Sequence, residues 1–237
     1  MNNILTIFRR EMRSYFNSPV AYIVIVLFLL IANGLFFWSD FFIRGNADLR
    51  GLFGISSFIM MFFTPAITMR LLAEERRSGT IEILVTLPVK DSEIVIGKFL
   101  AAFGLTALSI ILTFVAYITA ASLGEPDFGA SLGGYLGLIL MSGVYVAIGV
   151  FTSSMSLNQI VAFIVGFVII FGLFMLDKVL PFLPTALAST FEFLSVDYHF
   201  RNISRGVIDT RDIIYYLSMI FLFQYLAIRV TESRKWR

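Results

Sequence analysis

The sequence predicts an all-α membrane protein with six transmembrane helices. Hydrophobic residues make up 58% of its 237 residues and charged residues only 14%, whereas soluble domains carry about 25% charged residues. The charged residues are separated by uncharged runs of 16 to 49 residues, and about 20 apolar residues are enough for a helix to cross a bilayer. These runs disfavour the alternative of a soluble helical protein with a large core. Cysteine is absent, which excludes disulfides and thiolate metal sites.

The first element expected is an amphipathic helix over residues 2–17. At 100° per residue its apolar side chains fall on one face, and Arg9, Arg10 and Arg13 fall on the other. This pattern predicts a helix at the membrane surface, with the apolar face in the acyl boundary and the arginines toward anionic head groups. Lipid head groups explain these arginines better than nucleic acid does, so we expect no nucleic-acid partner. Whether the helix only anchors the chain or also touches a cytoplasmic protein stays open.

The six spans follow from the uncharged runs. The run of 49 residues before Asp177 is too long for one crossing and is divided at the polar stretch "SSMSLNQ". The last run has only 16 residues, but Arg211 and Arg229 at its ends can extend to the interfaces. The first run is long enough to span, so we expect no cleavable signal peptide. The expected spans are 20–39, 51–71, 95–123, 131–153, 158–176 and 212–230.

Charge sets the expected orientation. Of the 18 lysines and arginines, 12 fall on the side that holds both termini and the loop 72–93. The positive-inside rule then places this side in the cytoplasm, as expected of a multi-pass protein of the bacterial cytoplasmic (inner) membrane. Residues 177–211 form the longer extracytoplasmic segment. Its two prolines and mixed polarity predict short amphipathic helices at the outer surface.

The loop 72–93 holds the densest charge between two spans. Gly79 is expected to stop a helix that carries Glu74 to Arg77, and Thr80 can cap a short helix that Pro88 ends. Asp91 or Ser92 is expected to cap the third span. A helix of two turns is not stable alone in water, so it packs either on its own spans or on another protein. Both alternatives stay open at this point.

The stretch "EERRSGTIEILVTLPVKDSEIVIGKFLA" resembles the cytoplasmic coupling segment of ABC-2 type transporter permeases. The resemblance implies a permease subunit that pairs with a second or related permease copy and binds separate cytoplasmic ATPase subunits. ATP would be bound by those partners, so the chain itself would have no cofactor, no metal and no enzymatic activity. An extracytoplasmic auxiliary subunit is a further possible partner. The residues that the resemblance places in coupling are Glu74, Glu75, Arg77, Gly79, Thr80, Glu82 and Pro88.

Within this family, the N-terminal segment "FRREMRSYFNSPVAYI" is most similar to gliding-motility-associated permeases. The permeases of nitrous oxide reductase maturation are a similar alternative. The expected function is to couple ATP hydrolysis by a partner to export or to mechanical work across the membrane. A membrane scaffold that transmits work without transport is the other alternative.

The chain shows no motor of its own. Gly97 and Lys98 are followed by Phe99, so they do not form the Ser/Thr end of a P-loop. No ionisable residue lies in the middle of an expected span, which disfavours an ion-driven transporter. The one histidine, His199, falls in the outer segment near Ser195 and Asp197, a spacing that rarely gives a catalytic triad.

Neutral polar residues inside the spans allow two interpretations. They either pack helices together through hydrogen bonds or line a substrate path. The residues concerned are Asn33, Thr106, Ser109, Thr113 and Tyr117. Gly133 and Gly137 form a G-x-x-x-G pattern that favours close helix packing, and Pro65 is expected to kink the second span.

Overall fold

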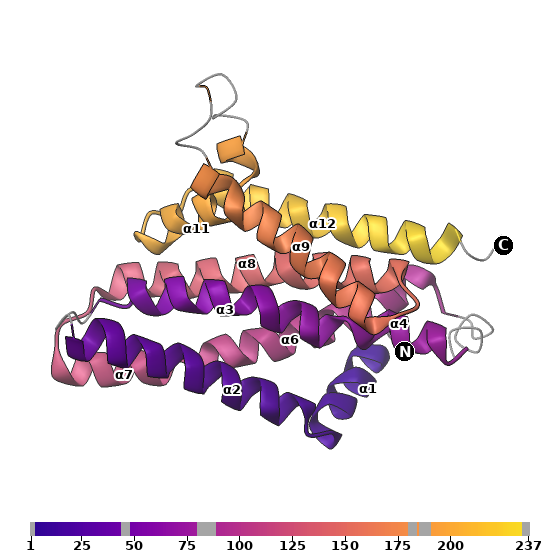
Figure 1. Ribbon diagram of the computed structural model, residues 1–237, viewed down its shortest axis with the longest axis horizontal. Helices are drawn as coiled ribbons and strands as arrows, with labels where there is room; N and C mark the ends of the chain where they lie inside the picture. Colours follow the sequence, from indigo (N-terminus) through magenta and orange to yellow (C-terminus); the bar gives the residue numbers. More distant parts are fainter. Residues whose placement is uncertain (1–2, 44–47, 80–88, 180–183, 185–190, 234–237) are drawn as a thin grey trace.

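The computed structural model describes residues 3–43, 48–79, 89–179, 184 and 191–233, and it shows a bundle of long helices (Figure 1). Six helical stretches are long and apolar enough to cross a membrane. They are Val20–Ile43, Arg50–Arg77, Asp91–Leu123, Phe128–Met155, Gln159–Val179 and Thr210–Glu232. All regular elements among the described residues are helices. The chain is therefore an all-α membrane protein, as its composition predicts.

Three of the six spans consist of two helical elements each. The pairs are α2 (Val20–Leu35) with the π-helix η1 (Phe36–Ile43), α3 (Arg50–Thr68) with α4 (Arg70–Arg77), and α6 (Asp91–Leu112) with α7 (Phe114–Leu123). The other three are α8 (Phe128–Met155), α9 (Gln159–Val179) and α12 (Thr210–Glu232). The shorter helices include α1 (Asn3–Asn17) and α11 (Val196–Ser204), and residues 191–194 form one further helical turn.

Helix α8 is the centre of the bundle. Within its most apolar window 78% of the residues are buried, against 22% for α9 and for α12. Glycines let its neighbours approach closely, since a Cβ at Gly134 would overlap the ring of Phe53 and one at Gly149 would overlap Thr68. Both neighbours belong to α3. Helices α4, α6, α9, α11 and α12 also pack against α8, so six of the described elements share one central support.

The second span is interrupted where it leaves the bundle. Pro65 lies inside α3, and the helix breaks at Met69, between α3 and α4. The Met69 N–H still donates to the Pro65 carbonyl oxygen at 2.9 Å. The kink expected at Pro65 therefore takes the form of a break one turn later, and α4 continues the span as a separate helical segment.

Helix α1 runs across the end of the bundle at a steep angle to α2 (Figure 1). Its arginines Arg9, Arg10 and Arg13 are exposed. Part of its apolar side packs on protein, however, because Ile7 packs against Gly97, and Phe8 lies against Gly104, both in α6. That the rest of this face, including the exposed Leu5, lies in the acyl boundary stays a prediction. The two glycines leave a shallow surface on α6 that receives α1.

The outer segment also differs from its expected position. The helix α11 is present, but its apolar side chains Val196, Phe200 and Ile203 are buried. Phe200 lies against Gly137, and the backbone of Ile203 lies against Gly133, both in α8. The G-x-x-x-G pattern thus serves close packing, and α11 belongs to the core instead of resting on the outer surface.

The third span begins differently from the expectation. Neither Asp91 nor Ser92 caps α6, which begins at Asp91 with Lys90 in the N-cap position. The Glu93 carboxylate accepts a hydrogen bond from the Lys90 N–H at 2.9 Å and another from the Asn3 side chain at 3.1 Å. Glu93 therefore caps its own helix and ties the start of α1 to it.

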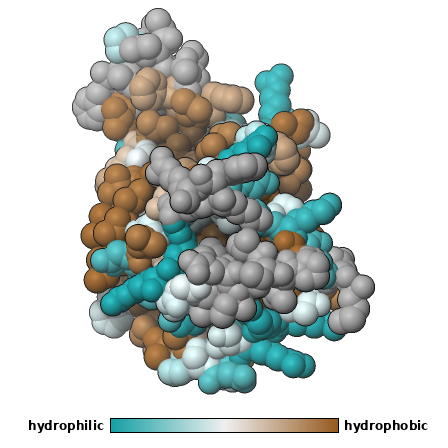
Figure 2. Space-filling model, turned by 90° about the vertical axis from the view of Figure 1, so that its right-hand side faces the viewer, coloured by the Kyte–Doolittle hydropathy of each residue, from teal (hydrophilic) through white to brown (hydrophobic). Residues whose placement is uncertain are grey.

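The start of α1 and the last turn of α12 lie toward the end of the bundle that carries α4 (Figure 1). Figure 2 shows this end, where hydrophilic side chains gather while apolar side chains cover the flanks. Such a distribution fits a polar face in water and apolar sides in lipid. The functional site is built at this end.

Candidate functional site

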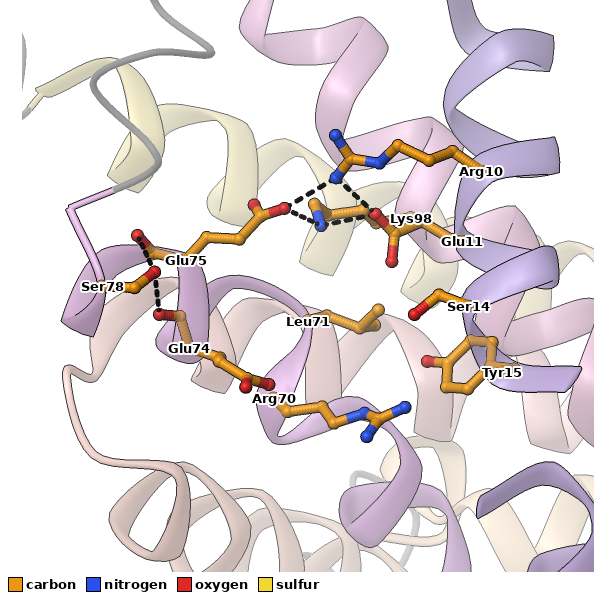
Figure 3. Close-up of a pocket in the computed structure, with 10 residues that line it drawn as sticks. All are labelled: Arg10, Glu11, Ser14, Tyr15, Arg70, Leu71, Glu74, Glu75, Ser78 and Lys98. Atoms are coloured by element: carbon orange, nitrogen blue, oxygen red, sulfur yellow. Dashed lines mark hydrogen bonds and ion pairs between the residues drawn. The ribbon is translucent and has the colours of Figure 1, made fainter. Parts of the chain in front are cut away.

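A polar pocket of about 410 Å³ lies between α1 and α4, with α6 beneath it (Figure 3). Charged and hydroxyl side chains from all three helices line it. They are Arg10, Glu11, Ser14 and Tyr15 of α1, Arg70, Glu74 and Glu75 of α4, Ser78 just after α4, and Lys98 of α6, together with the apolar Leu71.

Helix α4 is held by its apolar side and by one serine. Leu71, Leu72 and Ala73 are buried against the bundle. The break at Met69 leaves N–H groups of the first turn of α4 without helical acceptors. The Ser153 hydroxyl of α8 accepts from the Leu72 and Ala73 N–H groups at 3.0 and 3.1 Å, and donates to the Met69 carbonyl at 2.9 Å. Ser153 thus bridges the break and fixes α4 to the central helix.

A cluster of two acids and two bases joins α1, α4 and α6 (Figure 3). The Lys98 Nζ lies 3.0 Å from Glu11 Oε1 and 2.8 Å from Glu75 Oε1. Arg10 Nη2 lies 2.8 and 2.9 Å from the same two oxygens. We call these four residues the inner cluster. Its formal charges sum to zero, and each carboxylate oxygen is shared by both cations.

Lys98 is the most deeply buried member of the inner cluster, with only 1% of its side chain exposed. A buried ammonium group requires nearby counter-charges, and carboxylates from two other helices supply them. Burial by itself would raise the pKa of Glu11, but Lys98 and Arg10 outweigh it and hold that pKa below its ordinary value. The cluster therefore couples the positions of three helices.

The structure brings only part of the predicted coupling set together. Glu75 lies in the inner cluster, whereas Glu74, Arg77 and Gly79 are exposed at the end of α4. Gly79 has a φ of 72°, the left-handed conformation in which glycine ends a helix, as its position in the sequence predicts. Thr80, Glu82 and Pro88 lie outside the described residues.

Sequence reasoning missed Glu11, Lys98, Ser153 and Arg76. Arg76 donates to the Ser154 carbonyl oxygen, adding a second contact between α4 and α8. One signal was present in the sequence. Glu11 falls beside the apolar residues Phe8 and Met12 that pack on α6, so an acid at that position calls for a buried basic partner.

The neutral polar residues of the spans bond mainly within their own helices. The hydroxyls of Thr106, Ser109 and Thr113 each donate to a backbone carbonyl three or four residues earlier. Tyr117 stacks on Phe114 with ring centroids 5.0 Å apart. Asn33 is half-buried on α2. This geometry favours a packing role for the α6 hydroxyls over a substrate lining.

At the opposite end, His199 of α11 is paired with Asp212 of α12. His199 Nδ1 lies 2.6 Å from Asp212 Oδ1, and Nε2 lies 3.0 Å from the Phe193 carbonyl oxygen. Both ring nitrogens are thereby engaged, so neither faces Ser195, whose hydroxyl caps α11. We call His199 and Asp212 the outer pair. Its hydrogen bonds fix α11 to the last span.

The comparison with protein families gives one match. The family described as "ABC-2 family transporter protein" matches residues 44–229, a range that runs from the residues before α3 to the last turns of α12. No curated protein matches the chain. The matched range covers well over half of the chain and includes the interrupted second span, the connector and the outer segment. The chain therefore belongs to the ABC-2 family of transporters and is a permease subunit of an ABC transporter.

Proposed function

We propose that this permease receives the work of a separate cytoplasmic ATPase at α4 and the connector that follows it, and passes that work to the membrane helices. ABC-2 permeases generally work with such an ATPase. The observation that carries the proposal is the inner cluster, in which Lys98 is bonded to Glu75 of α4 and Glu11 of α1. A displacement of α4 must move or break these contacts.

Two surfaces have separate roles in this proposal. The exposed end of α4, with Arg77 and the positive-φ Gly79, belongs to the docking surface for the ATPase. The inner cluster and the Ser153 bridge lie behind it and join α4 to α1, α6 and α8. Docking and transmission therefore rest on different residues and can be separated by mutation.

The proposal also covers what the ATP-driven motion accomplishes, which is export or mechanical work. The similarity of "FRREMRSYFNSPVAYI" to gliding-motility-associated permeases supports a role in export or in mechanical work on an outer partner. This segment lies outside the residues that the family match covers. A second permease copy completes the transporter, and the cytoplasmic membrane is the proposed location, with both termini in the cytoplasm.

The experiment compares Arg77→Glu with Lys98→Met in the permease co-expressed with its ATPase. We expect Arg77→Glu to reduce co-purification of the ATPase. We expect Lys98→Met to retain the ATPase but to lose most of the permease-dependent stimulation of ATP hydrolysis, because the link between α4 and α6 is removed. Arg13→Gln serves as a matched control, since Arg13 is exposed on α1 and lies outside the pocket.

Two results would contradict the proposal. If Arg77→Glu binds the ATPase as the wild type does, the docking surface is elsewhere. If Lys98→Met supports full stimulation while folding normally, the inner cluster does not transmit work. The thermal unfolding midpoint of each variant separates loss of coupling from loss of fold.

A further inference from the structure

The pocket contains a cation outside the inner cluster. The Arg70 guanidinium lies over the ring of Tyr15, 5.4 Å from its centroid, and forms no ion pair with any other residue that the structure describes. The Tyr15 hydroxyl donates to the Ile67 carbonyl oxygen at 3.3 Å, which fixes the ring beneath the guanidinium. Arg70 is thus held by stacking, and its N–H groups remain available to a ligand in the pocket.

An acid lies one helical turn further along α4. The Glu74 side chain lines the same pocket, and within the described ranges it has no salt-bridge partner. Four residues of a helix rise by about 6 Å, so α4 presents a positive and a negative group at that spacing along its axis. The remaining charged groups of the pocket belong to the inner cluster and neutralise one another.

The depth of Arg70 matches that of lipid phosphate groups. It is the first charged residue after the 19 uncharged residues 51–69. At about 1.5 Å per residue these span roughly 28 Å, close to the thickness of the hydrocarbon core. Glu74 follows one turn later on α4. Going from the hydrocarbon core toward the polar end, the second span therefore presents first a cation, Arg70, and then an anion, Glu74.

We propose that this pocket binds the head group of a phospholipid that carries both a phosphate and a primary ammonium group. The Arg70 fork donates to the phosphate oxygens, a geometry that guanidinium groups match well. The ammonium group, two carbons further from the bilayer, donates to the Glu74 carboxylate. A trimethylammonium group has no N–H to donate. Phosphatidylcholine can therefore bond Arg70 through its phosphate but cannot donate a hydrogen bond to Glu74. The proposal does not depend on docking of the ATPase.

The size of the pocket agrees with this occupant. Its volume of about 410 Å³ falls within the usual range of small-molecule sites, roughly 300 to 1,000 Å³. The acyl chains stay in the bilayer beside α1 and α3, while the head group enters between α1 and α4. A bound lipid would bridge these two helices next to the inner cluster.

The experiment measures lipid binding to the purified full chain in a neutral detergent, without the ATPase. The protein is delipidated and titrated with phosphatidylethanolamine, phosphatidylcholine or phosphatidylglycerol, and bound lipid is counted by native mass spectrometry. We expect phosphatidylethanolamine to bind most tightly. Arg70→Gln should weaken its binding by about tenfold or more, because a charge-assisted bidentate contact is lost.

Further variants separate the two halves of the site. Glu74→Gln should remove the preference for phosphatidylethanolamine over phosphatidylcholine. Arg77→Gln is the matched control, since Arg77 lies on the same helix but does not line the pocket, and it should bind lipid as the wild type does. Arg70→Lys keeps the positive charge but loses the two parallel N–H donors of the guanidinium, so it should bind with intermediate affinity. This variant tests the site if Arg70→Gln unfolds.

Three results would overturn the proposal. The first is equal binding of the three lipids by the wild type. The second is equal loss of binding in Arg70→Gln and Arg77→Gln. The third is displacement of the lipid by soluble phosphoethanolamine at equal concentration, which would assign the pocket to a small phosphate compound instead of a membrane lipid.

Discussion

The inner cluster and the outer pair hold buried polar groups in different ways. At the polar end, the inner cluster shares two acids between two bases and borders an open pocket. At the other end, the outer pair joins one acid to one imidazole, with only 4% and 5% of the two side chains exposed. The ring of Tyr215 stacks on His199 with centroids 3.9 Å apart and closes the site.

The inner cluster and the outer pair differ in how many hydrogen-bond partners remain when one acidic side chain is removed. In the inner cluster each cation bonds two carboxylates, so removal of one acid leaves the other in place. Loss of Asp212 would leave His199 buried with no other carboxylate at hydrogen-bonding distance among the described residues. A buried polar group that loses its hydrogen-bond partner is destabilising. The outer pair therefore resists change, whereas the inner cluster tolerates the loss of one acid.

The largest expected effect follows from Asp212→Ala. We expect the free energy of unfolding to fall by about 2–3 kcal/mol, because the buried His199 Nδ1 loses its hydrogen-bond partner. Unfolding in mixed micelles measures it. The double variant His199→Phe with Asp212→Leu replaces both polar side chains by apolar groups and should recover much of the loss. A cost for Asp212→Ala no larger than that of Glu11→Ala would contradict the comparison.

Glu11→Ala should have a smaller effect. We expect about 1–2 kcal/mol, because one hydrogen-bonded acceptor is lost while Glu75 continues to bond Lys98 and Arg10. The same unfolding assay measures the change. Glu232→Ala is the control, since its ion pair with Arg229 is exposed and should change stability by less than about 0.5 kcal/mol. A loss of 3 kcal/mol or more for Glu11→Ala would show that the inner cluster has no redundancy.

The smallest expected effect is a dependence on acid pH. The pKa of Glu11 in the folded protein lies below its ordinary value of 4.5, so the unfolded chain binds a proton before the folded one does. The stabilisation by Glu11 is complete above about pH 4.5 and is lost as the pH falls through the folded pKa. The difference between the thermal midpoints of wild type and Glu11→Gln should be smaller at pH 4 than at pH 7. A difference that stays constant would argue against charge as the cause.

The fold was largely predictable because the bilayer restricts it. Uncharged runs of sufficient length must form helices there, and all six appear. The positions of α1 and α11 were not predictable in this way. Both are amphipathic, and their apolar faces could equally have met lipid. Glycines on the facing helices allow both to pack against protein instead. They are Gly97 and Gly104 for α1, and Gly133 and Gly137 for α11. Their role is visible only once it is known which helices pack together.

The site was predictable only in part. Family resemblance indicated Glu75, but its partner Lys98 lies 23 residues after it, and Glu11, the other acid that bonds Lys98, lies 87 residues before Lys98. Periodicity relates residues within one helix and cannot pair three helices. Lys98 also lies only two turns after the start of α6. In the sequence it therefore resembles a charged residue at the end of a transmembrane span, although the structure buries it. Ser153 lies in a stretch that predicts only a turn.

The break at Met69 makes the second span a rod of two segments instead of one. An unbroken helix that is pushed at its end slides or bends along its whole length, at the cost of many backbone hydrogen bonds. A segmented rod changes its angle at the break, where the hydroxyl of one serine takes the place of helical partners. A swing of α4 about Ser153 changes the contacts that α4 itself makes with the inner cluster and α8, while α3 keeps its packing on α8.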